Sequence, residues 1–564
     1  MIIGLDAGGT HTDVVLFGDE GIITEVKVPT DSSDLFNTVL TGVDKITEGV
    51  APGDITRVVL STTLTTNAIV QGRNPQVGMI VSGGPGIDPE FFRTNEHYFP
   101  VSGSTDHRGR EVEPVNENEI REIADRLKKE DIRNIGIVSK FSVRNPKHEL
   151  KISEILKDSF GKIFMGHQIS GNLNFPRRIA TTYLNATVRP IHKKFFEAVR
   201  NSLEKKGLSV PIHILKADGG TMSIEASIDF PGQSILSGPA ASVMGAIAFA
   251  SDEEESLVLD IGGTTTDIAL LINRIPLLEP LGIRVGNYKT LIRSLKTHSI
   301  GIGGDSAVRV RDGILEIGPD RVGPAMAHGG TFPTPTDALA VLGKVRNGDR
   351  EQSVKGIDTV AQALGTSLEE AAFRIFDQAC QKILAAVRDM TERINKKPVY
   401  TVHEIQEDYQ VNPKKMLILG GPAPYFARHL EEISDFKAGV VPRWHVANAI
   451  GAALARTTCE VTLFADTEQG ILAAPEEQFS ETIPAGFSKE EVIEKAYELL
   501  NRKALQRGAS DTEELETDIT EDLEFNMVRG FYTAGKNIRV KMQVKPGLIY
   551  ENEVVAEKLL ANVY

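Results

Sequence analysis

The sequence predicts an α/β protein with two lobes and a small α+β module at its C-terminal end. The first observation is a repeated pattern, Asp-x-Gly-Gly-Thr-x-Thr-Asp, which occupies residues 6–13 and 260–267 and is flanked by apolar runs in both places. A recurrence of this kind indicates a repeated structural unit. The second is the alternation of strand-like and helix-like segments through most of the chain, which is typical of α/β layers. The third is a change of pattern after about residue 459.

The length of the chain indicates more than one domain, and its net charge excludes some classes of partner. A chain of 564 residues is too long for one hydrophobic core. We expect an N-terminal lobe at 1–175, a second lobe at 176–458 and the small module, of unknown role, at 459–564. The net charge of −15 argues against nucleic acid or an anionic membrane as the main partner.

Cysteine content and hydropathy exclude further classes of protein. The two cysteines, Cys380 and Cys459, cannot form a metal cluster or a disulfide framework. No segment approaches the roughly 20 apolar residues that cross a bilayer. The chain begins with a strand-like run, so we expect no signal peptide and a cytoplasmic location.

Each copy of the repeated pattern predicts a tight β-hairpin that binds an anion. The runs Ile2–Leu5 and Leu257–Leu259 predict buried strands, and the Gly-Gly pair reverses the chain into a second strand. Glycine lacks a Cβ atom, so successive backbone N–H groups in the turn can approach a bound anion. Threonine hydroxyls add further donors. The expected phosphate-binding residues are Gly8, Gly9, Thr10 and Thr12 in one copy and Gly262, Gly263, Thr264 and Thr266 in the other.

Asp6 and Asp260 stand where a strand ends, at the lip of each turn. A carboxylate there would repel a phosphate directly. It fits better as a holder of water around Mg²⁺, because this ion keeps several waters and bridges to phosphate oxygens. Two facing hairpins can clamp a triphosphate from both sides, whereas the alternative is a pair of purely structural hairpins.

Other candidate positions follow predicted strands. The hydroxyl-rich segment 62–68 lies at the C-terminal end of a strand, where ligands collect in open α/β sheets, but it also fits an N-capped helix start. Asp218 ends a strand beside two glycines, and the Gly-Gly pair at 420–421 offers a flat surface for an adenine ring. Runs of small residues at 236–245 and 447–455 predict two helices that cross closely at a hinge between the halves.

Two glycine-rich loops, at 297–306 and 322–330, are long enough to be functional or disordered. They carry His298 and His328, which are candidate polar groups for a substrate or structural histidines. The acidic stretch 508–524 predicts a solvated linker.

Several motifs together resemble one known family. The chain resembles the hydantoinase A / 5-oxoprolinase family, within the actin, heat-shock ATPase and sugar-kinase superfamily, over about residues 1 to 455. The resemblance implies a duplicated ribonuclease-H-like, actin-like ATPase fold with inserted subdomains. In that family a cyclic amide is opened with ATP hydrolysis, and relatives form the ATP-using subunit of ketone carboxylases. The motifs are Asp6–Asp13, Thr62–Ala68, Phe141–Glu149, Thr181–Pro190, Leu236–Gly245, Asp260–Asp267, His298–Ser306 and Thr336–Gly343.

The resemblance also implies roles for individual residues. The two hairpins would hold opposite sides of the ATP phosphates, and Gly420 and Gly421 would meet the adenosine. Asp6 and Asp260 would order Mg²⁺ and its waters. Together, the hairpins, the aspartates and the ion would supply the positioning and the charge neutralisation that phosphoryl transfer requires. The resemblance further implies a small-molecule substrate, a possible second enzyme subunit and possible oligomers. Asp13 and Asp267 would brace the hairpins or position the nucleophile.

This chain departs from the family pattern in its presumed substrate half. It has Asp218 where the family usually has Asn, Asp305 where it has Gly, and Met326-Ala327-His328 where Cys-Tyr-Gly is common. The phosphate hairpins match the family pattern, so the resemblance supports ATP binding by this chain more strongly than it supports a particular substrate.

The leading hypothesis is an ATP-dependent hydrolase that opens a hydantoin-like or 5-oxoproline-like cyclic amide by phosphorylating its carbonyl oxygen, or the ATP-using subunit of such an enzyme. The alternatives are the ATP-using subunit of a ketone carboxylase, a small-molecule kinase with Asp218 as general base, and a non-redox ATP-driven switch that acts on a protein partner.

Overall fold

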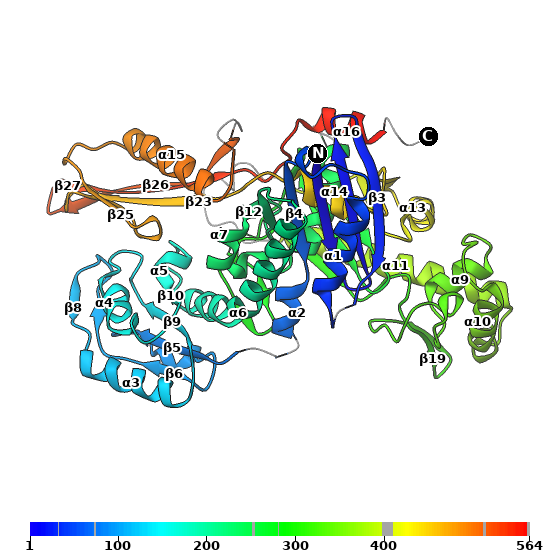
Figure 1. Cartoon of the computed structure of the whole chain (residues 1–564), viewed down its shortest axis with the longest axis horizontal. Helices are drawn as coiled ribbons and strands as arrows, with labels where there is room; N and C mark the ends of the chain where they lie inside the picture. Colours follow the sequence, from blue (N-terminus) through cyan, green and yellow to red (C-terminus); the bar gives the residue numbers. More distant parts are fainter. Residues whose placement is uncertain are drawn as a thin grey trace.

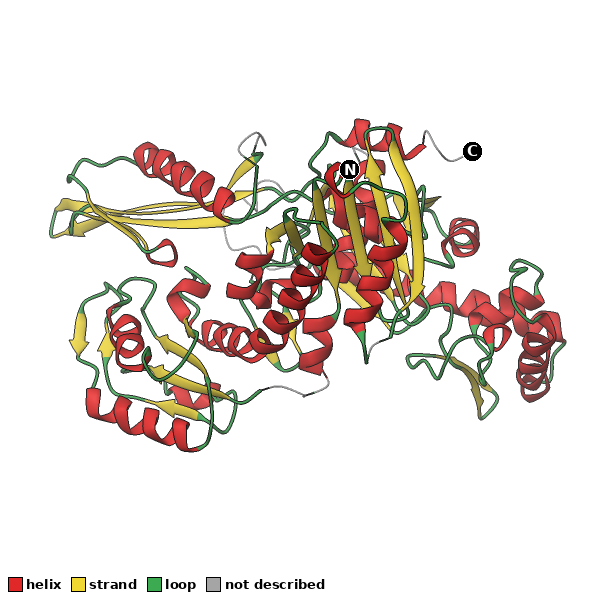
Figure 2. Ribbon diagram, in the orientation of Figure 1, coloured by secondary structure: helices red, strands yellow, loops and turns green. Residues whose placement is uncertain are grey.

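The computed structural model describes residues 1–560 except 32, 71, 73–74, 251–253, 280, 397–409 and 511–514. Two β-sheets form the centre of the molecule (Figures 1 and 2). An inserted α/β part and the C-terminal module project to the left of the view, one below the other, and a helical part projects to the lower right (Figure 1).

The first central sheet has the strand order β12-β11-β4-β1-β2-β3. Strand β2 runs antiparallel to both of its neighbours, whereas β4 and β11 run parallel to β1. The side chains of β1 are buried on both faces: Ile3 and Leu5 pack against α1 and α6 on the outer face, and Ile2 packs against α14 on the inner face. The bounds are β1 (Ile2–Ala7), β2 (His11–Gly18), β3 (Gly21–Pro29), β4 (Arg57–Thr62), β11 (Ile212–Leu215), β12 (Thr221–Ser223), α1 (Leu35–Ile46), α2 (Leu64–Val70), α6 (Phe175–Lys205) and α7 (Ile224–Asp229).

The second central sheet repeats this arrangement with the order β15-β14-β13-β21-β22. Strand β14 is antiparallel to its neighbours, and β21 and β22 run parallel to β13. Leu257 and Leu259 face α11 on the outer side, and Val258 faces α8 on the inner side. The bounds are β13 (Ser256–Ile261), β14 (Thr266–Ile272), β15 (Ile275–Pro276), β18 (Thr297–Ile300), β21 (Lys415–Leu419), β22 (Lys437–Val440), α9 (Pro335–Val341), α10 (Arg350–Leu364), α11 (Leu368–Asn395) and α13 (Ala423–Glu432).

Helices α8 (Ser237–Ala246) and α14 (Ala447–Leu454) pack against the inner faces of the two sheets and against one another. Their approach depends on glycine, because a Cβ atom on Gly245 would lie 2.1 Å from the Ala447 carbonyl oxygen. On Gly451 it would lie 2.1 Å from the Ala241 carbonyl oxygen. The predicted close crossing of these two helices is confirmed, and their action as a hinge stays a prediction.

A four-stranded parallel sheet, β10-β9-β5-β6, is inserted between β4 and β11. Because β11 and β12 return to the first central sheet, that sheet extends beyond the lobe boundary that we expected at residue 175. The bounds are β5 (Val77–Ser82), β6 (Tyr98–Pro100), β7 (Ser104–Thr105), β8 (Glu111–Glu113), β9 (Asn134–Ser139), β10 (Ile163–Met165), α3 (Glu117–Lys129), α4 (Lys147–Leu156) and α5 (Gly166–Ile169).

The C-terminal module is a five-stranded antiparallel sheet, β25-β24-β23-β27-β26, covered by α15. The acidic stretch that we expected to be a linker instead contributes to β26, whose side chains are mostly exposed and whose first residues, 517–522, are mainly acidic or hydroxyl-bearing. Helix α16 leaves the module and packs Val555 and Leu559 with Ile2 of the first sheet. The bounds are β23 (Glu460–Asp466), β24 (Ile471–Ala474), β25 (Phe479–Thr482), β26 (Thr517–Arg529), β27 (Tyr532–Val544), α15 (Lys489–Gln506) and α16 (Asn552–Leu560).

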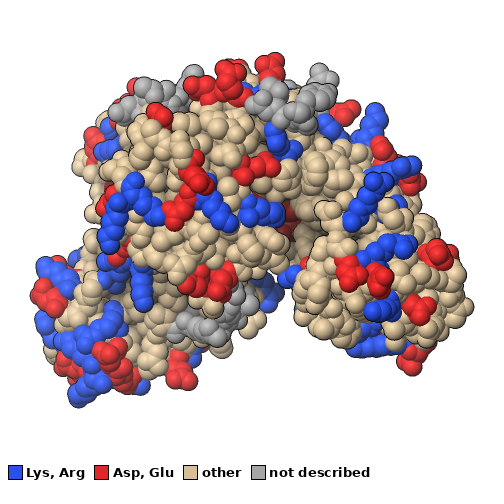
Figure 3. All heavy atoms as spheres, turned by 45° about the vertical axis from the view of Figure 1, so that its right-hand side comes forward, with Lys and Arg blue, Asp and Glu red and all other residues tan. Residues whose placement is uncertain are grey.

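The molecular surface is hollowed between two rounded masses on the face shown in Figure 3. Acidic and basic side chains are interspersed over this face. Within the part of the chain that the structure describes, no helix combines the length and the apolar content that a membrane span requires.

Candidate functional site

Four aspartates lie on the inner faces of the two central sheets. Asp6 pairs with Asp13 across the first hairpin, and Asp260 pairs with Asp267 across the second. Side chains alternate between the faces of a strand, so each pair shares the face that packs against α8 and α14. The repeated sequence pattern therefore places four carboxylates at equivalent positions beside the two turns.

The two hairpins are joined through one side chain of α14. The Asn448 amide donates to Asp260 Oδ2 over 3.1 Å and also hydrogen bonds to Asp6. Ser242 of α8 donates to the same Asp260 oxygen over 2.6 Å, and Ser61 at the end of β4 hydrogen bonds to Asp6. Asp6 and Asp260 thus meet at one amide, one from each sheet.

Burial and neighbouring negative charge raise the pKa of two of these carboxyls. Burial, together with the charges of Asp13 and Asp260, raises the pKa of Asp6 to about 7. Burial and the neighbouring Asp260 likewise raise the pKa of Asp267 to about 7, although a hydrogen bond with Ser299 opposes the shift. A cation placed among these groups would favour their charged forms.

The donor set fits a hydrated Mg²⁺ rather than an ion enclosed by protein. Among the described residues, no group of three or more His, Cys, Asp or Glu side chains is arranged to hold a metal. Mg²⁺ commonly uses one or two carboxylates and completes its shell with water and phosphate oxygens. Asp6 and Asp260 supply two such carboxylates at the base of the two hairpins.

Both turns are closed by equivalent backbone bonds. Gly8 N–H donates to His11 O over 3.1 Å, and Gly262 N–H donates to Thr265 O over 2.9 Å. A side chain on Gly9 would meet nothing within 4 Å, so the tip of the first hairpin faces open space. These features suit a phosphate at the first turn, and the assignments of Gly8, Gly9, Thr10, Gly262, Gly263 and Thr264 to phosphate binding stay predictions.

Thr12 and Thr266 are corrections to the predicted phosphate-binding set. Both side chains are buried. The Thr12 hydroxyl pairs with the Thr30 hydroxyl over 2.9 Å, and the Thr266 hydroxyl donates to Ile302 O over 2.7 Å. Each follows the strand alternation and faces away from its neighbouring aspartate, so each braces its hairpin.

Asp13 also braces its hairpin. Its carboxylate forms an ion pair with Lys27 of β3 over 2.8 Å. Burial raises the pKa of Asp13 in spite of this partner. Asp267 has Ser299 as its hydrogen-bond partner and, within the part of the chain that the structure describes, forms no ion pair with a cation, so the two equivalent aspartates differ in their surroundings.

The tip of the second hairpin is covered by an ion pair. Asp305 N–H donates to Gly263 O over 2.7 Å, and a Cβ atom on Gly263 would lie 2.8 Å from Asp305 Oδ2. Arg321 donates to that same carboxylate oxygen over 2.8 Å. Both charges also influence the pKa of His11 in the first hairpin, so this pair lies near that hairpin as well.

Gly420 is required by the close approach of β21 to the second hairpin. Its φ angle is +94°, and a Cβ atom there would lie 2.3 Å from Ile261 O and 2.7 Å from Asp260 Oδ1. Gly421 is exposed, and a Cβ atom there would meet nothing within 4 Å. Gly421 therefore has open space beside it, and the predicted contact of Gly420 and Gly421 with an adenosine stays a prediction.

Asp218 does not join the four aspartates. It is buried beside Lys216, Thr458 and Arg293, in a separate cavity that no residue of either hairpin lines. The neighbouring Lys216 and Arg293 cations hold the pKa of Asp218 below its usual value. A carboxylate with these partners is a poor proton acceptor, which removes the basis for its predicted role as a general base.

His298 is also placed away from the cleft face. It pairs with Ile268 in the β14–β18 ladder and shares the outer face with that core residue, near Arg393 of α11. The next residue, Ser299, lies on the inner face and hydrogen bonds to Asp267. The structure therefore places Ser299, and not His298, on the face of the four aspartates, and it gives no support to the predicted substrate contact of His298.

Sequence reasoning missed the polar side chains that connect the aspartates. Asn448 is the single polar residue among the small apolar residues of α14, and Ser242 is the single polar residue of α8 after its first position, which was the available signal. Ser61 and Ser299 could be found only from the alternation of their strands.

The family and the fold are established by comparison with known proteins. The family profile described as Hydantoinase/oxoprolinase matches residues 178–461, and that described as Hydantoinase/oxoprolinase N-terminal region matches residues 2–160. The caprolactamase subunit alpha of Pseudomonas jessenii is 23% identical over 491 residues, which cover 78% of this chain and 68% of the relative. The 5-oxoprolinase of Saccharomyces cerevisiae is 26% identical over 273 residues, covering 46% of this chain and 20% of that protein.

Two solved structures have a fold similar to that of this chain. The ATP-dependent caprolactamase from Pseudomonas jessenii has a TM-score of 0.71 at 19% identity and covers 97% of this chain and 87% of its own. The nucleotide-free acetone carboxylase structure has a TM-score of 0.70 at 19% identity, with 98% and 88% covered. With one family profile matching half of the sequence and a second matching most of the remaining N-terminal part, the chain belongs to the hydantoinase/oxoprolinase family.

Proposed function

We propose that this chain uses ATP to open a cyclic amide, either alone or as the ATP-using subunit of a larger enzyme. The observation that carries the proposal is the meeting of Asp6 and Asp260, one from each matched hairpin, at the Asn448 amide. The family membership and the ATP-dependent relatives support the same function. The repeated strand order of the two central sheets supports a duplicated, actin-like ATPase fold with lobes on either side of α8 and α14.

In the proposed reaction the amide oxygen attacks the γ-phosphorus of ATP and ADP leaves. Asp267 takes the amide N–H proton, because a carboxyl with a pKa of about 7 can accept a proton near neutral pH. One water then adds to the activated carbon and the ring C–N bond breaks, leaving an acyl phosphate. A second water hydrolyses the acyl phosphate to a carboxylic acid and phosphate.

The remaining residues have positioning roles. Bound Mg²⁺ would neutralise charge on the phosphates, and Asp6 and Asp260 would hold its waters. Asn448 and Ser242 would fix the orientation of Asp260, and Lys27 would fix Asp13. The turn of the first hairpin would receive phosphate oxygens on backbone N–H groups.

A second subunit fits the C-terminal module. Strand β26 is an unpaired edge of its sheet, and the β26–β27 hairpin exposes Phe525, Val528, Phe531 and Tyr532. Exposed apolar groups on an open strand edge are a place for another chain to bind. Several relatives are subunits of larger enzymes by name, which supports such a partner.

A ketone carboxylase subunit is the second candidate, favoured by the acetone carboxylase structure with its TM-score of 0.70. Both candidates share phosphorylation of a carbonyl oxygen and differ in the nucleophile that follows. The small-molecule kinase with Asp218 as base is disfavoured by the ion pairs of that residue.

The test is ATP turnover by the purified chain with Mg²⁺ and a panel of hydantoins, 5-oxoproline, caprolactam and small ketones. We expect at least one cyclic amide to increase ADP release and to give a ring-opened product. If ATP and Mg²⁺ bind but no member of the panel changes turnover, with or without the relative's second subunit, the proposal is wrong. Stimulation by a ketone in the presence of bicarbonate would select the carboxylase alternative.

A further inference from the structure

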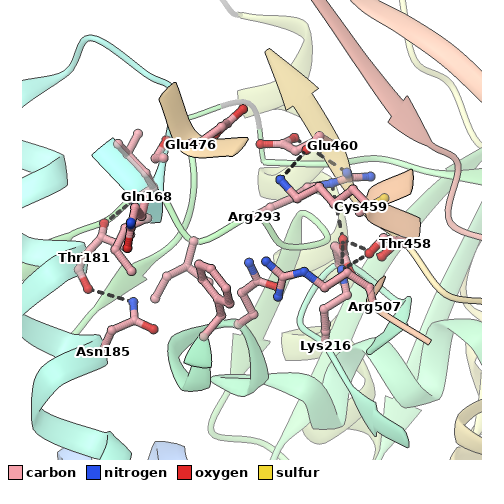
Figure 4. Close-up of a pocket in the computed structure, with 18 residues that line it drawn as sticks. Gln168, Thr181, Asn185, Lys216, Arg293, Thr458, Cys459, Glu460, Glu476 and Arg507 are labelled. Atoms are coloured by element: carbon pink, nitrogen blue, oxygen red, sulfur yellow. Dashed lines mark hydrogen bonds and ion pairs between the residues drawn. The ribbon is translucent and has the colours of Figure 1, made fainter. Parts of the chain in front are cut away.

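A second polar cavity lies apart from the two hairpins. It has a volume of about 60 Å³ and lies where the inserted part, the edge of the first sheet and the C-terminal module meet (Figures 1 and 4). Space of this size holds several waters or one small polar group. None of its lining residues belongs to either hairpin.

Four cations line this cavity, and three of them have carboxylate partners. Lys216 and Arg293 pair with Asp218, and Lys503 pairs with Glu477. Arg507, which follows the last residue of α15, has no carboxylate within 4 Å among the described residues, and its Nη1 atom is buried without a hydrogen-bond partner. A buried guanidinium nitrogen without an acceptor is costly, so an acceptor from a ligand would be stabilised there.

The position of Arg507 is fixed by stacking. Its guanidinium lies over the Phe230 ring at 3.9 Å from the centroid. In Figure 4 the guanidinium extends toward the middle of the cavity, and Gln168, Thr181 and Asn185 lie on the opposite side. A stacked guanidinium presents its N–H groups in one plane, which matches the plane of a carboxylate.

The cavity adjoins a larger groove. The groove has a volume of about 760 Å³ and shares Ser170, Leu291, Arg293 and Glu460 with the cavity. One of its sides is apolar and includes Ile275, Leu277 and Leu281. A ligand with a charged end and an apolar body could therefore place its charge in the cavity and its body in the groove.

We propose that this cavity and groove bind a small organic carboxylate, with the carboxylate on Arg507 and the apolar body against Ile275, Leu277 and Leu281. Three acidic side chains, Asp218, Glu460 and Glu476, also line the cavity, so a single negative charge is favoured over a doubly charged phosphate. This proposal depends only on these contacts, and it does not require that the hairpins bind ATP.

The test uses the full chain and three probes: butyrate, its neutral isostere butyramide, and inorganic phosphate. Isothermal titration should show butyrate binding at least tenfold more tightly than either of the other probes. Arg507→Gln should weaken butyrate binding by at least tenfold. Equal affinity for butyrate and butyramide, stronger binding of phosphate, or unchanged binding by the variant would overturn the proposal.

Arg144→Gln is the matched control. Arg144 is also a partly buried arginine with an unpartnered Nη1, stacked on Phe464 at 3.6 Å, but it does not line the cavity. It should leave butyrate binding unchanged. If Arg507→Gln does not fold by circular dichroism, Arg507→Lys keeps the charge but loses the planar contact, and it should bind butyrate more weakly than the wild type. Equal binding by Arg507→Lys would then count against the site.

Discussion

At the scale of single residues, the candidate site is defined by carboxylates held close to one another. Asp6 and Asp267 each have a pKa of about 7, raised chiefly by burial and further by neighbouring aspartates. Such groups reduce the stability of the empty protein when they are charged and become useful when a cation or a proton arrives. The charges that serve function at these positions therefore lower the stability of the folded protein.

The first prediction concerns Asp6→Asn. A carboxyl whose folded pKa is about 7 favours the folded state at low pH, and this contribution is lost as pH rises from the unfolded value of 3.8 through 7. Between pH 5 and pH 8 the wild type should therefore lose more thermal stability than Asp6→Asn. At pH 8 the variant should have a melting temperature about 2 °C or more above that of the wild type.

The measurement is a series of thermal unfolding curves at constant ionic strength, repeated with Mg²⁺. The ion should raise the melting temperature of the wild type at pH 8 more than that of Asp6→Asn, because the variant lacks one charge for the ion to neutralise. Identical pH profiles for the two proteins would show that Asp6 is not the group that titrates.

The second prediction concerns Asp305, which stands where the family usually has Gly. Its carboxylate covers the tip of the second hairpin and pairs with Arg321. Asp305→Gly removes a negative charge from a place where phosphate is expected and releases Arg321 to meet it. We expect the affinity for Mg·ATP to increase about fivefold, in line with the modest energies of partly exposed charges.

Equilibrium titration with Mg·ATP measures this effect, and Asp305→Asn is the control that removes the charge while keeping the shape. Both variants should bind ATP more tightly than the wild type. A loss of affinity in both would mean instead that the carboxylate is needed to position Arg321.

At the scale of elements, strand alternation explains both the successes and the errors of sequence-based prediction. The Asp and Gly positions of the hairpins were predictable because they belong to a local repeated pattern. Thr12 and His298 were assigned incorrectly because consecutive strand residues face opposite sides, so Thr12 cannot share the face of Asp13 and His298 cannot share that of Ser299.

Contacts between distant elements account for what the sequence could not predict. Asn448 reaches Asp260 across 188 positions of the chain, and no local pattern reports such a contact. Strand β26 was missed because it is an edge strand with mostly exposed side chains, so its sequence resembles an acidic linker. The ion pairs of Asp218 depend on Arg293 and Thr458, which are likewise far away in sequence.

The third prediction concerns the crossing of α8 and α14. Gly245→Ala introduces a methyl group 2.1 Å from a backbone oxygen, so the helices must separate, and we expect a loss of about 3 kcal/mol in the free energy of unfolding. Gly238→Ala lies in the same helix, where an added Cβ atom meets nothing within 4 Å, and it should not reduce stability. Urea unfolding measures both, and equal effects would show that the close crossing is not needed.

At the scale of the whole molecule, two sheets of the same topology enclose a layer of two helices, and each sheet presents one hairpin to the space between them. The inserted part and the C-terminal module add a second polar cavity at some remove from the hairpins. In our proposals, the same architecture provides one place for a nucleotide and another for a small carboxylate.

The central claim is that both hairpins hold one nucleotide, and the most direct measurement is calorimetric titration of the full chain with Mg²⁺ and a nonhydrolysable ATP analogue. We predict one site per chain and at least tenfold weaker binding in both Gly9→Asp and Thr264→Asp, which add a negative charge to one hairpin each. Gly53→Asp adds the same charge at an exposed position with open space around it and should bind as the wild type does. Two sites per chain, or unchanged binding in either hairpin variant, would contradict the claim.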